Sequence, residues 1–308
     1  MKLHRLFLAL AGVPAAITLV PTAGHAQNRH LNINIEGKAE SCADLRVRSE
    51  GEIARSSETY TLQRNEAPVL EVNSADRGVI RVRGADRNDF TVEICKVAAA
   101  EDQATAGQLL SSLSVSRLGG RFTANKPATV PGNAEWQMYF IVHAPTDASF
   151  NLETKNGPID VASITGNIRA RSTNGPLALK DCGGVIDAQT TNGPIAFSGA
   201  GGDVRLNTTN GPISLKLAND VWSGPRLEAR TTNGPLSIAV PDTFQTGVRV
   251  ETDGHSPMSC RIDACAHAVT DATADHKTLQ LNGSGETVRV STSNGPISVG
   301  NQNRKKII

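Results

Sequence analysis

The chain has 308 residues, with 31 lysines and arginines against 30 aspartates and glutamates. A formal net charge of +1 gives no electrostatic case for a nucleic-acid partner. Aromatic residues make up only 4% of the chain, whereas glycine, threonine and short aliphatic residues are plentiful, which favours many short strands and tight turns.

Residues 1–26 have the order of a secretory signal peptide. A basic start with Lys2 and Arg5 precedes an apolar run over 6–20 and a small-residue segment that ends at Ala26. The apolar run is too short for a membrane span, and no later segment approaches the length a span needs. We therefore expect cleavage after Ala26 and an exported mature chain, periplasmic or secreted, without an integral membrane segment.

Residues 27–150 lack any repeat and predict a β-rich N-terminal cap region. Alternating strand patterns cover 44–49, 69–74, 79–84, 90–95 and 136–143. One segment, about 100–118, predicts a helix with Leu109, Leu110 and Leu113 on one face. We expect this helix to cover one end or one face of the cap.

Asn-Gly-Pro triplets recur through the rest of the chain. They begin at Asn156, Asn174, Asn192, Asn210, Asn233 and Asn294, with an Asp253-Gly254 variant. The first three intervals are each 18 residues, and later intervals accumulate insertions. A fixed period near 20 residues is typical of a solenoid.

Each repeat holds two short runs of alternating apolar residues. One run follows the proline, as in Ile195-x-Phe197, and the second comes about nine residues later, as in Val204-x-Leu206. Two short strands cannot bury their apolar faces alone, so neighbouring repeats must stack, and equivalent strands then run parallel. The predicted fold is mainly β: a parallel β-solenoid, β-helix-like, over 151–300, with an insertion at about 253–285 and a tail at 301–308.

The repeated triplet predicts a structural corner of the coil. Asn-Gly supplies positive φ angles and proline starts the next strand. Because the asparagines keep the parity of the buried residues before them, we expect Asn174, Asn192, Asn210 and Asn233 to form an internal ladder. The predicted corner residues are Asn156, Gly157, Asn174, Gly175, Asn192, Gly193, Asn210, Gly211, Asn233, Gly234, Asn294 and Gly295.

One outward position carries charges whose signs alternate along the array. Arg169, Asp187, Arg205, Glu228 and Arg249 occupy the same place in successive repeats. Opposite charges on neighbouring strands stabilise a sheet by a few tenths to about 1 kcal/mol per pair. The column therefore indicates a structural role for these groups rather than an active site.

Five cysteines predict disulfides in an exported chain. We expect Cys42 to pair with Cys95 and Cys260 with Cys265, which leaves Cys182 free, although it could compete for either late partner. A catalytic role for Cys182 has no suitably placed histidine to support it.

Cysteines and histidines cluster in the segment 253–285. We expect this segment to form a larger terminal coil, cross-linked by a disulfide, that shields the open sheet edge. A metal site is the alternative, formed by Cys260, Cys265, His255, His267 and His276. The paired ligand spacing of structural zinc sites is missing, so the sequence predicts neither a metal nor a cofactor.

The chain resembles the bacterial "putative adhesin" family of exported β-repeat proteins. The resemblance is carried by the stretches 70–74 and 78–84, the helix near Leu109, the strand 141–145 and the Thr-x-Asn-Gly-Pro-Ile array that ends at Gly300. It implies a parallel β-solenoid and an adhesive or cell-envelope role, with an unknown protein or glycan as partner. The chain departs from the family by its prolines after Asn-Gly and by its cysteine-containing insertion, and no catalytic or binding residue carries over.

The function that the sequence favours is a non-enzymatic, exported scaffold. The alternative is a carbohydrate-active β-helix enzyme, a polysaccharide lyase or hydrolase, which would need clustered carboxylates or a basic group and aromatic platforms. Trp136 and Trp222 are the only tryptophans. A third possibility is an ice-facing surface, in which Thr191, Thr209 and Thr232 stack beside a second threonine column at Thr190, Thr208 and Thr231.

Overall fold

The computed structural model describes residues 34–36, 39–253, 256–273 and 275–301. The predicted signal peptide lies outside the described residues, as do His255 and most of the tail. No helix in the described part of the chain is long and apolar enough to cross a membrane.

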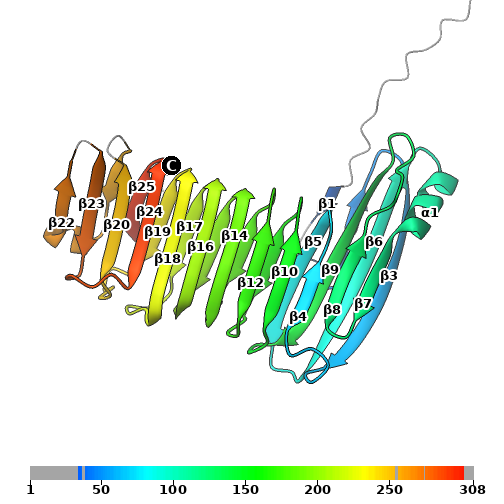
Figure 1. Ribbon diagram of the computed structural model, residues 1–308, viewed down its shortest axis with the longest axis horizontal. Coiled ribbons are helices and arrows are strands. Elements are labelled where there is room, and N and C mark those ends of the chain that lie inside the picture. Colours follow the sequence, from blue (N-terminus) through cyan, green and yellow to red (C-terminus); the bar gives the residue numbers. More distant parts are fainter. Residues whose placement is uncertain (1–33, 37–38, 254–255, 274, 302–308) are drawn as a thin grey trace, which may run out of the picture. The chain divides into compact units, whose positions relative to one another are not determined.

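The described strands form two large mixed sheets and one small one (Figure 1). In order, the 12-stranded sheet contains β22 (Val269–Ala272), β23 (His276–Leu281), β20 (Val248–Asp253), β24 (Val288–Asn294), β18 (Ser223–Asn233), β16 (Gly201–Asn210), β14 (Val185–Asn192), β12 (Ile168–Ser172), β10 (Phe150–Thr154), β4 (Leu70–Asn73), β8 (Arg121–Asn125) and β7 (Ser114–Leu118). The 11-stranded sheet contains β21 (Met258–Cys260), β25 (Ile297–Asn301), β19 (Leu236–Val240), β17 (Ile213–Leu217), β15 (Ile195–Gly199), β13 (Leu177–Lys180), β11 (Ile159–Ala162), β5 (Gly78–Ala85), β9 (Glu135–Pro145), β6 (Asp89–Ala100) and β3 (Glu52–Gln63). The small sheet pairs β1 (Asn34–Glu36) with β2 (Arg46–Arg48).

Each repeat supplies one strand to each large sheet, and equivalent strands pair in parallel. In the 12-stranded sheet Ile186 lies in register with Ile168 on one side and Val204 on the other. Alternate residues of these strands are buried: Ile186 is 1% exposed and Ala188 is fully buried. Burying an aliphatic side chain contributes about 1.5 to 3 kcal/mol, so stacking is the main source of stability in this region.

The prediction of a mainly β chain is confirmed, but a wholly parallel solenoid is not, because both sheets are mixed. The strands from β10 to β18 pair in parallel. Towards one end β6 pairs antiparallel with both β3 and β9, and β7 pairs antiparallel with β8. At the other end β23 is antiparallel to β20 and β22. Antiparallel neighbours need no further repeat beside them, which suits the two ends of an array.

The last repeat does not lie last in space. Its strand β24 sits between β18 and β20, and its strand β25 sits between β19 and β21. The strands β20 to β23 thus lie at the far end of the array, and the chain then returns to fill the place between them and the strands β18 and β19. The predicted charge column is therefore wrong at its end: Glu228 neighbours Arg289, and Arg249 lies beside Arg289 rather than beside Glu228.

The described residues include one α-helix, α1, over Gln103–Ser112. It is shorter than the predicted segment, because Leu113 is already extended and β7 begins at Ser114. The Asp102 side chain accepts a hydrogen bond from the backbone N–H of Thr105 at 2.8 Å and caps the helix. Its buried residues, Ala106 and Leu109, face the main core, and the helix packs against β3 and β6.

Two apolar clusters hold the described fold together. The main core lies between the large sheets and includes residues from Ala54 to Val299. A smaller cluster of Ala39, Leu45, Cys95 and Ile141 lies apart from it. The disulfide Cys42–Cys95 joins the short 3-10 helix η1 (Cys42–Asp44) to β6 beside this second cluster.

Candidate functional site

The corner asparagines form a continuous hydrogen-bonded column, which we call the Asn ladder. Each side-chain Nδ2 donates to the Oδ1 of the asparagine one repeat beneath it, at 2.7 to 2.9 Å. The ladder consists of Asn156, Asn174, Asn192, Asn210, Asn233 and Asn294.

The Asn ladder is exposed, so the predicted internal position is wrong. The alternation of buried and exposed residues stops at the corner, where Thr191 and Asn192 both face solvent. The last inward position is therefore Thr190, two residues before the asparagine, which is 5% exposed. Its hydroxyl donates to the carbonyl of Gly175 at 3.0 Å.

The inward threonines repeat this hydrogen bond from one repeat to the next. Thr208 donates to the carbonyl of Gly193 at 3.0 Å, and Thr231 donates to that of Gly211 at 2.9 Å. These buried hydroxyls donate hydrogen bonds to corner carbonyl groups that have no partner within the sheets. The ice-facing alternative needs two exposed threonine columns, and the structure leaves only the column of Thr191, Thr209 and Thr232 exposed.

Glycine is required at the corner for a different reason from the one predicted. Gly193 and Gly211 are not among the described residues with positive φ. A Cβ added to Gly193 would lie 2.3 Å from the carbonyl oxygen of Gly175, and one added to Gly211 would lie 2.2 Å from that of Gly193. Close stacking of successive corners therefore excludes a side chain. These residues build the scaffold, and their polar groups are occupied by one another.

A polar groove lies on the outer face of the 12-stranded sheet, over strands β10 to β18. Its volume is about 730 Å³. One outward position in register along these strands forms its floor, with the residues Glu153, Arg171, Gln189, Asn207 and Arg230. The exposed threonines Thr173, Thr191, Thr209 and Thr232 line it on the corner side, and Asn151 and Arg169 line it opposite.

One ion pair is built into the groove wall. The guanidinium of Arg171 contacts both carboxylate oxygens of Asp187, with Nη2–Oδ2 at 2.6 Å and Nη1–Oδ1 at 3.1 Å. Gln189 Nε2 also donates to Asp187 Oδ1 at 3.2 Å. Burial would raise the pKa of the Asp187 carboxyl, but the hydrogen bonds and charge of Arg171 outweigh it and hold the pKa below its usual value. Asp187 is therefore an ionised structural group.

Two other arginines of the groove are differently placed. Arg169 and Arg230 are exposed, and neither makes a hydrogen bond or ion pair with another side chain of the described chain. The predicted charge column includes Arg169 but not Arg230. Arg230 belongs to a second outward column, two residues further along each strand, which also contains Arg171, Gln189 and Asn207.

The groove contains only part of what the enzyme alternative requires. Glu153 is the only carboxylate among its lining residues, all of which the structure describes. Hydrolysis of a glycosidic bond ordinarily uses two carboxylates on either side of it. Among the lining residues there is likewise no histidine, cysteine or lysine, and the basic groups are the guanidinium groups of Arg169, Arg171 and Arg230.

The cysteines lie away from the groove. Cys42–Cys95 and Cys260–Cys265, the two predicted pairs, are disulfides, so their sulfur atoms are not available as the thiolate ligands of the metal alternative. Cys182 is free and buried, and burial raises the pKa of its thiol to about 11. A thiol with such a pKa is a poor nucleophile. In the part of the chain that the structure describes, no three histidine, cysteine, aspartate or glutamate side chains gather as metal ligands would.

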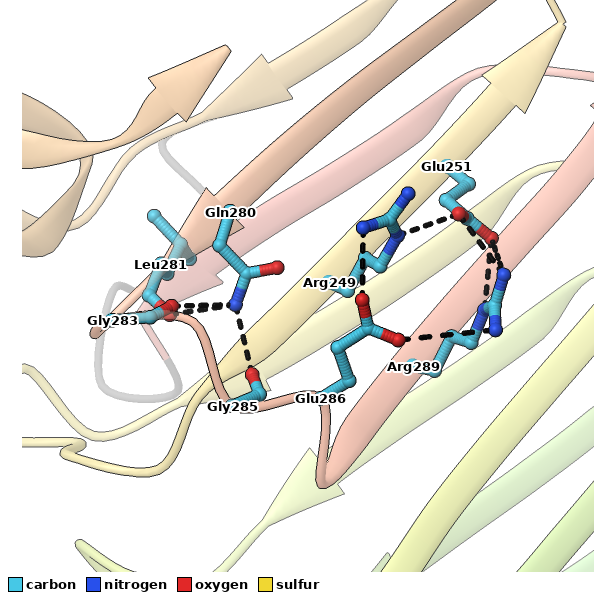
Figure 2. A network of polar contacts seen from close by, with 8 residues as sticks. All are labelled: Arg249, Glu251, Gln280, Leu281, Gly283, Gly285, Glu286 and Arg289. Carbon is cyan, nitrogen blue, oxygen red and sulfur yellow. Dashed lines mark hydrogen bonds and ion pairs between the residues drawn. The ribbon is translucent and has the colours of Figure 1, made fainter. Parts of the chain in front are cut away.

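A second polar cluster, the C-terminal charge network, secures the far end of the array (Figure 2). Arg249 and Arg289 lie side by side in register, and Glu251 binds both, at 2.6 Å from Arg249 Nε and 2.8 Å from Arg289 Nη2. Glu286 contacts Arg249 Nη1 at 2.8 Å. The two glutamates thus neutralise the repulsion of two arginines that register brings together.

The side-chain amide of Gln280 helps to hold the loop next to this network. Gln280 Nε2 donates to the carbonyls of Gly283 and Gly285, each at 2.8 Å (Figure 2). This bond fixes the turn that leads from β23 back to Glu286 and β24. The network and the loop therefore have a structural role at the point where the last repeat enters the sheet.

Compared with known proteins, the sequence matches no family model and no curated protein. Solved structures that are similar to it include a "putative cell adhesion protein" from Clostridium sporogenes (11% identity, 81% of this chain and 100% of that one, TM-score 0.32), a "putative adhesin" from Bacteroides fragilis (10%, 80% and 97%, 0.34) and a "putative lipid binding protein" from Parabacteroides distasonis (9%, 81% and 98%, 0.31). TM-scores this low support no inference about the ligand or activity of this chain.

Proposed function

We propose that the protein is an exported, adhesin-like β-repeat scaffold of the cell envelope, periplasmic or secreted, which binds a ligand in the polar groove and catalyses no reaction. The observation that carries this proposal is the groove of about 730 Å³, whose lining residues are all polar and come from neighbouring strands. Ligand sites are concave, and the polar groups that converge in them fix the orientation of the ligand and provide specificity.

The proposal assigns each part of the chain a place. Residues 1–26 are the signal peptide, residues 27–150 form a β-rich cap, and residues 151–300 form a parallel β-solenoid with an insertion at about 253–285. Parallel pairing from β10 to β18, with one register shift between Gly201 and Asp203, supports the solenoid. The two disulfides fit an exported protein, because disulfides persist in oxidising compartments.

Rigidity of the corner is what makes the outer face suitable for binding. The Asn ladder and the buried threonines fix each strand relative to the next. Side chains on the groove floor therefore keep their spacing without a ligand. A preorganised site loses less conformational entropy when the ligand binds.

The test is co-sedimentation of the full chain with envelope fragments from the cells that produce it. Asn207→Trp would fill the groove, and Lys216→Trp places the same bulk on the 11-stranded sheet, where Lys216 is exposed. We expect the wild type and Lys216→Trp to sediment with the fragments and Asn207→Trp to remain in solution.

Two results would overturn the proposal. One is sedimentation that is absent for the wild type or unchanged by Asn207→Trp, which would remove the groove as a binding site. The other is release of reducing or unsaturated sugar ends during the incubation, which would show that the protein is an enzyme.

A further inference from the structure

The charges of the groove identify a class of ligand. We propose that the polar groove binds a linear polysaccharide that carries carboxylate groups, lying across strands β12 to β18. This inference rests on the proposed function and names the chemistry of its ligand. It begins from the difference between the arginine that is paired within the groove and the two that are not.

Arg171 is already satisfied, whereas Arg169 and Arg230 are available. The two oxygens of Asp187 occupy the guanidinium of Arg171. Arg169 and Arg230 are exposed and make no hydrogen bond or close ion pair within the described chain, although Arg169 lies in register with Asp187 and its charge contributes to the lowered pKa of that carboxyl. A guanidinium forms its strongest contacts with a planar carboxylate through two parallel hydrogen bonds. The groove therefore presents two sites for ligand carboxylates.

The spacing of these arginines calls for an extended ligand. Arg169 lies on β12 and Arg230 on β18, with β14 and β16 between them. Three steps between neighbouring strands and an offset of two residues along the strand give a separation of roughly 16 Å at the backbone. Between the two lie the amides of Gln189 and Asn207 and the hydroxyl of Thr191, which can exchange hydrogen bonds with sugar hydroxyls.

The lining argues against other classes of ligand. All fifteen lining residues are polar, so the groove offers no surface for an acyl chain or for the apolar anchors of a peptide. None of them is aromatic, so the bases of a single-stranded nucleic acid would find nothing to stack on. The groove also lies on a sheet face, away from the sheet edges where a peptide strand could add.

The carboxylate of Glu153 restricts where the anionic groups of the ligand can lie in the groove. Glu153 lies on β10 and is exposed, and its carboxylate makes no hydrogen bond or ion pair with another side chain of the described chain. An ionised Glu153 repels a ligand carboxylate in its vicinity, which places the anionic groups over β12 to β18. Removing this charge should therefore strengthen binding, while removing either free arginine should weaken it.

The experiment measures binding of the full chain to oligogalacturonate by isothermal titration calorimetry, with methyl-esterified oligogalacturonate as the matched neutral ligand. We expect binding of the acidic form that weakens as salt is raised, because salt screens exposed charges. The neutral form should bind at least about tenfold more weakly, since it cannot form the charged contacts. Alginate oligosaccharides provide a second acidic chain.

Three variants test the geometry. Arg169→Gln and Arg230→Gln should each weaken binding roughly tenfold, and Glu153→Gln should strengthen it severalfold. Lys216→Gln removes one positive charge from the 11-stranded sheet and should leave the affinity unchanged. Circular dichroism of each variant checks that it is folded.

Four outcomes would overturn the inference: no binding of either acidic chain, equal binding of the acidic and esterified forms, equal weakening by Lys216→Gln, or tighter binding of a single-stranded oligonucleotide than of oligogalacturonate. The inference can fail while the proposed function holds. If Asn207→Trp abolishes sedimentation with envelope fragments but no acidic chain binds, the groove binds a ligand of another chemistry.

Discussion

The buried threonine column should contribute measurably to stability, and two adjacent threonines allow a matched test. Thr208 is 5% exposed and its hydroxyl donates to the Gly193 carbonyl at 3.0 Å. Thr209 is exposed, and its hydroxyl makes no hydrogen bond within the described part of the protein. Valine has nearly the shape of threonine and an equally good preference for strands. Replacing either residue by valine therefore removes a hydroxyl and little else.

The expected size of the effect follows from the hydrogen bond. Removing the donor from a buried carbonyl costs about 1 to 3 kcal/mol. The methyl group that replaces the Thr208 hydroxyl recovers at most about 0.8 kcal/mol through burial. Thr208→Val should therefore lower the free energy of unfolding by about 1 to 2 kcal/mol, whereas Thr209→Val should change it by less than about 0.5 kcal/mol.

Urea unfolding provides the assay, followed by far-ultraviolet circular dichroism and by the fluorescence of Trp136 and Trp222, which are 6% and 4% exposed. The slope of the free energy against urea concentration should stay the same in both variants, so that the midpoint reports stability alone. An equal effect of the two substitutions, or no effect of Thr208→Val, would refute the role of the buried hydroxyl.

Two further predictions concern the corner and the C-terminal charge network. Gly193→Ala places a Cβ 2.3 Å from the Gly175 carbonyl oxygen and should lower the free energy of unfolding by about 1 to 3 kcal/mol. Gly107→Ala, in α1, places its Cβ with no atom within 4 Å and should raise the free energy of unfolding by about 0.5 to 1 kcal/mol. Urea midpoints that move in the same direction for both variants would contradict this prediction. Burial would raise the pKa of the Glu251 carboxyl, but Arg249 and Arg289 hold this pKa below its ordinary value of 4.5. The ionised carboxyl therefore contributes to stability above pH 4.5, and this contribution is lost as the pH falls through the lower pKa of the folded state. The urea midpoint should fall more steeply below pH 4.5 in the wild type than in Glu251→Gln.

Strand positions could be predicted from the sequence because burial on one face of a strand leaves a period of two. Ile195 and Phe197 in β15 and Val204 and Leu206 in β16 are buried as the alternation requires. Side-chain parity fails at the corner, where β14 ends. Asn192 has the parity of a buried residue and still pairs with Asn210, yet it is exposed, because regular pairing is interrupted at Thr191 and the alternation is lost there.

The order of the last strands could not be predicted, because spacing along the chain does not determine which strand is the spatial neighbour. After β19 the chain has two ways to continue the stack: the strands after Thr246, or those after Thr287. Both carry alternating valines, at Val248 and Val288. Only the second is followed by a complete Asn-Gly-Pro corner, and Asn294 donates to Asn233 at 2.9 Å. The position next to β18 is therefore taken by the strand whose corner can continue the Asn ladder.

The groove could not be predicted from the sequence, because the residues of its floor do not repeat. Stacking requires the inward threonines, the corner glycines and the asparagines, and the repeat conserves these within the chain at Thr190-Asn192-Gly193 and again at Thr208-Asn210-Gly211. It places no such demand on the outward floor of the groove, where Gln189 lies in register with Arg171 on one side and Asn207 on the other. Chemistry that varies from strand to strand has no period and cannot be found by searching for one. In an array held together by its repeated residues, a ligand site is therefore expected among the outward residues that do not repeat, which is where Arg169 and Arg230 lie.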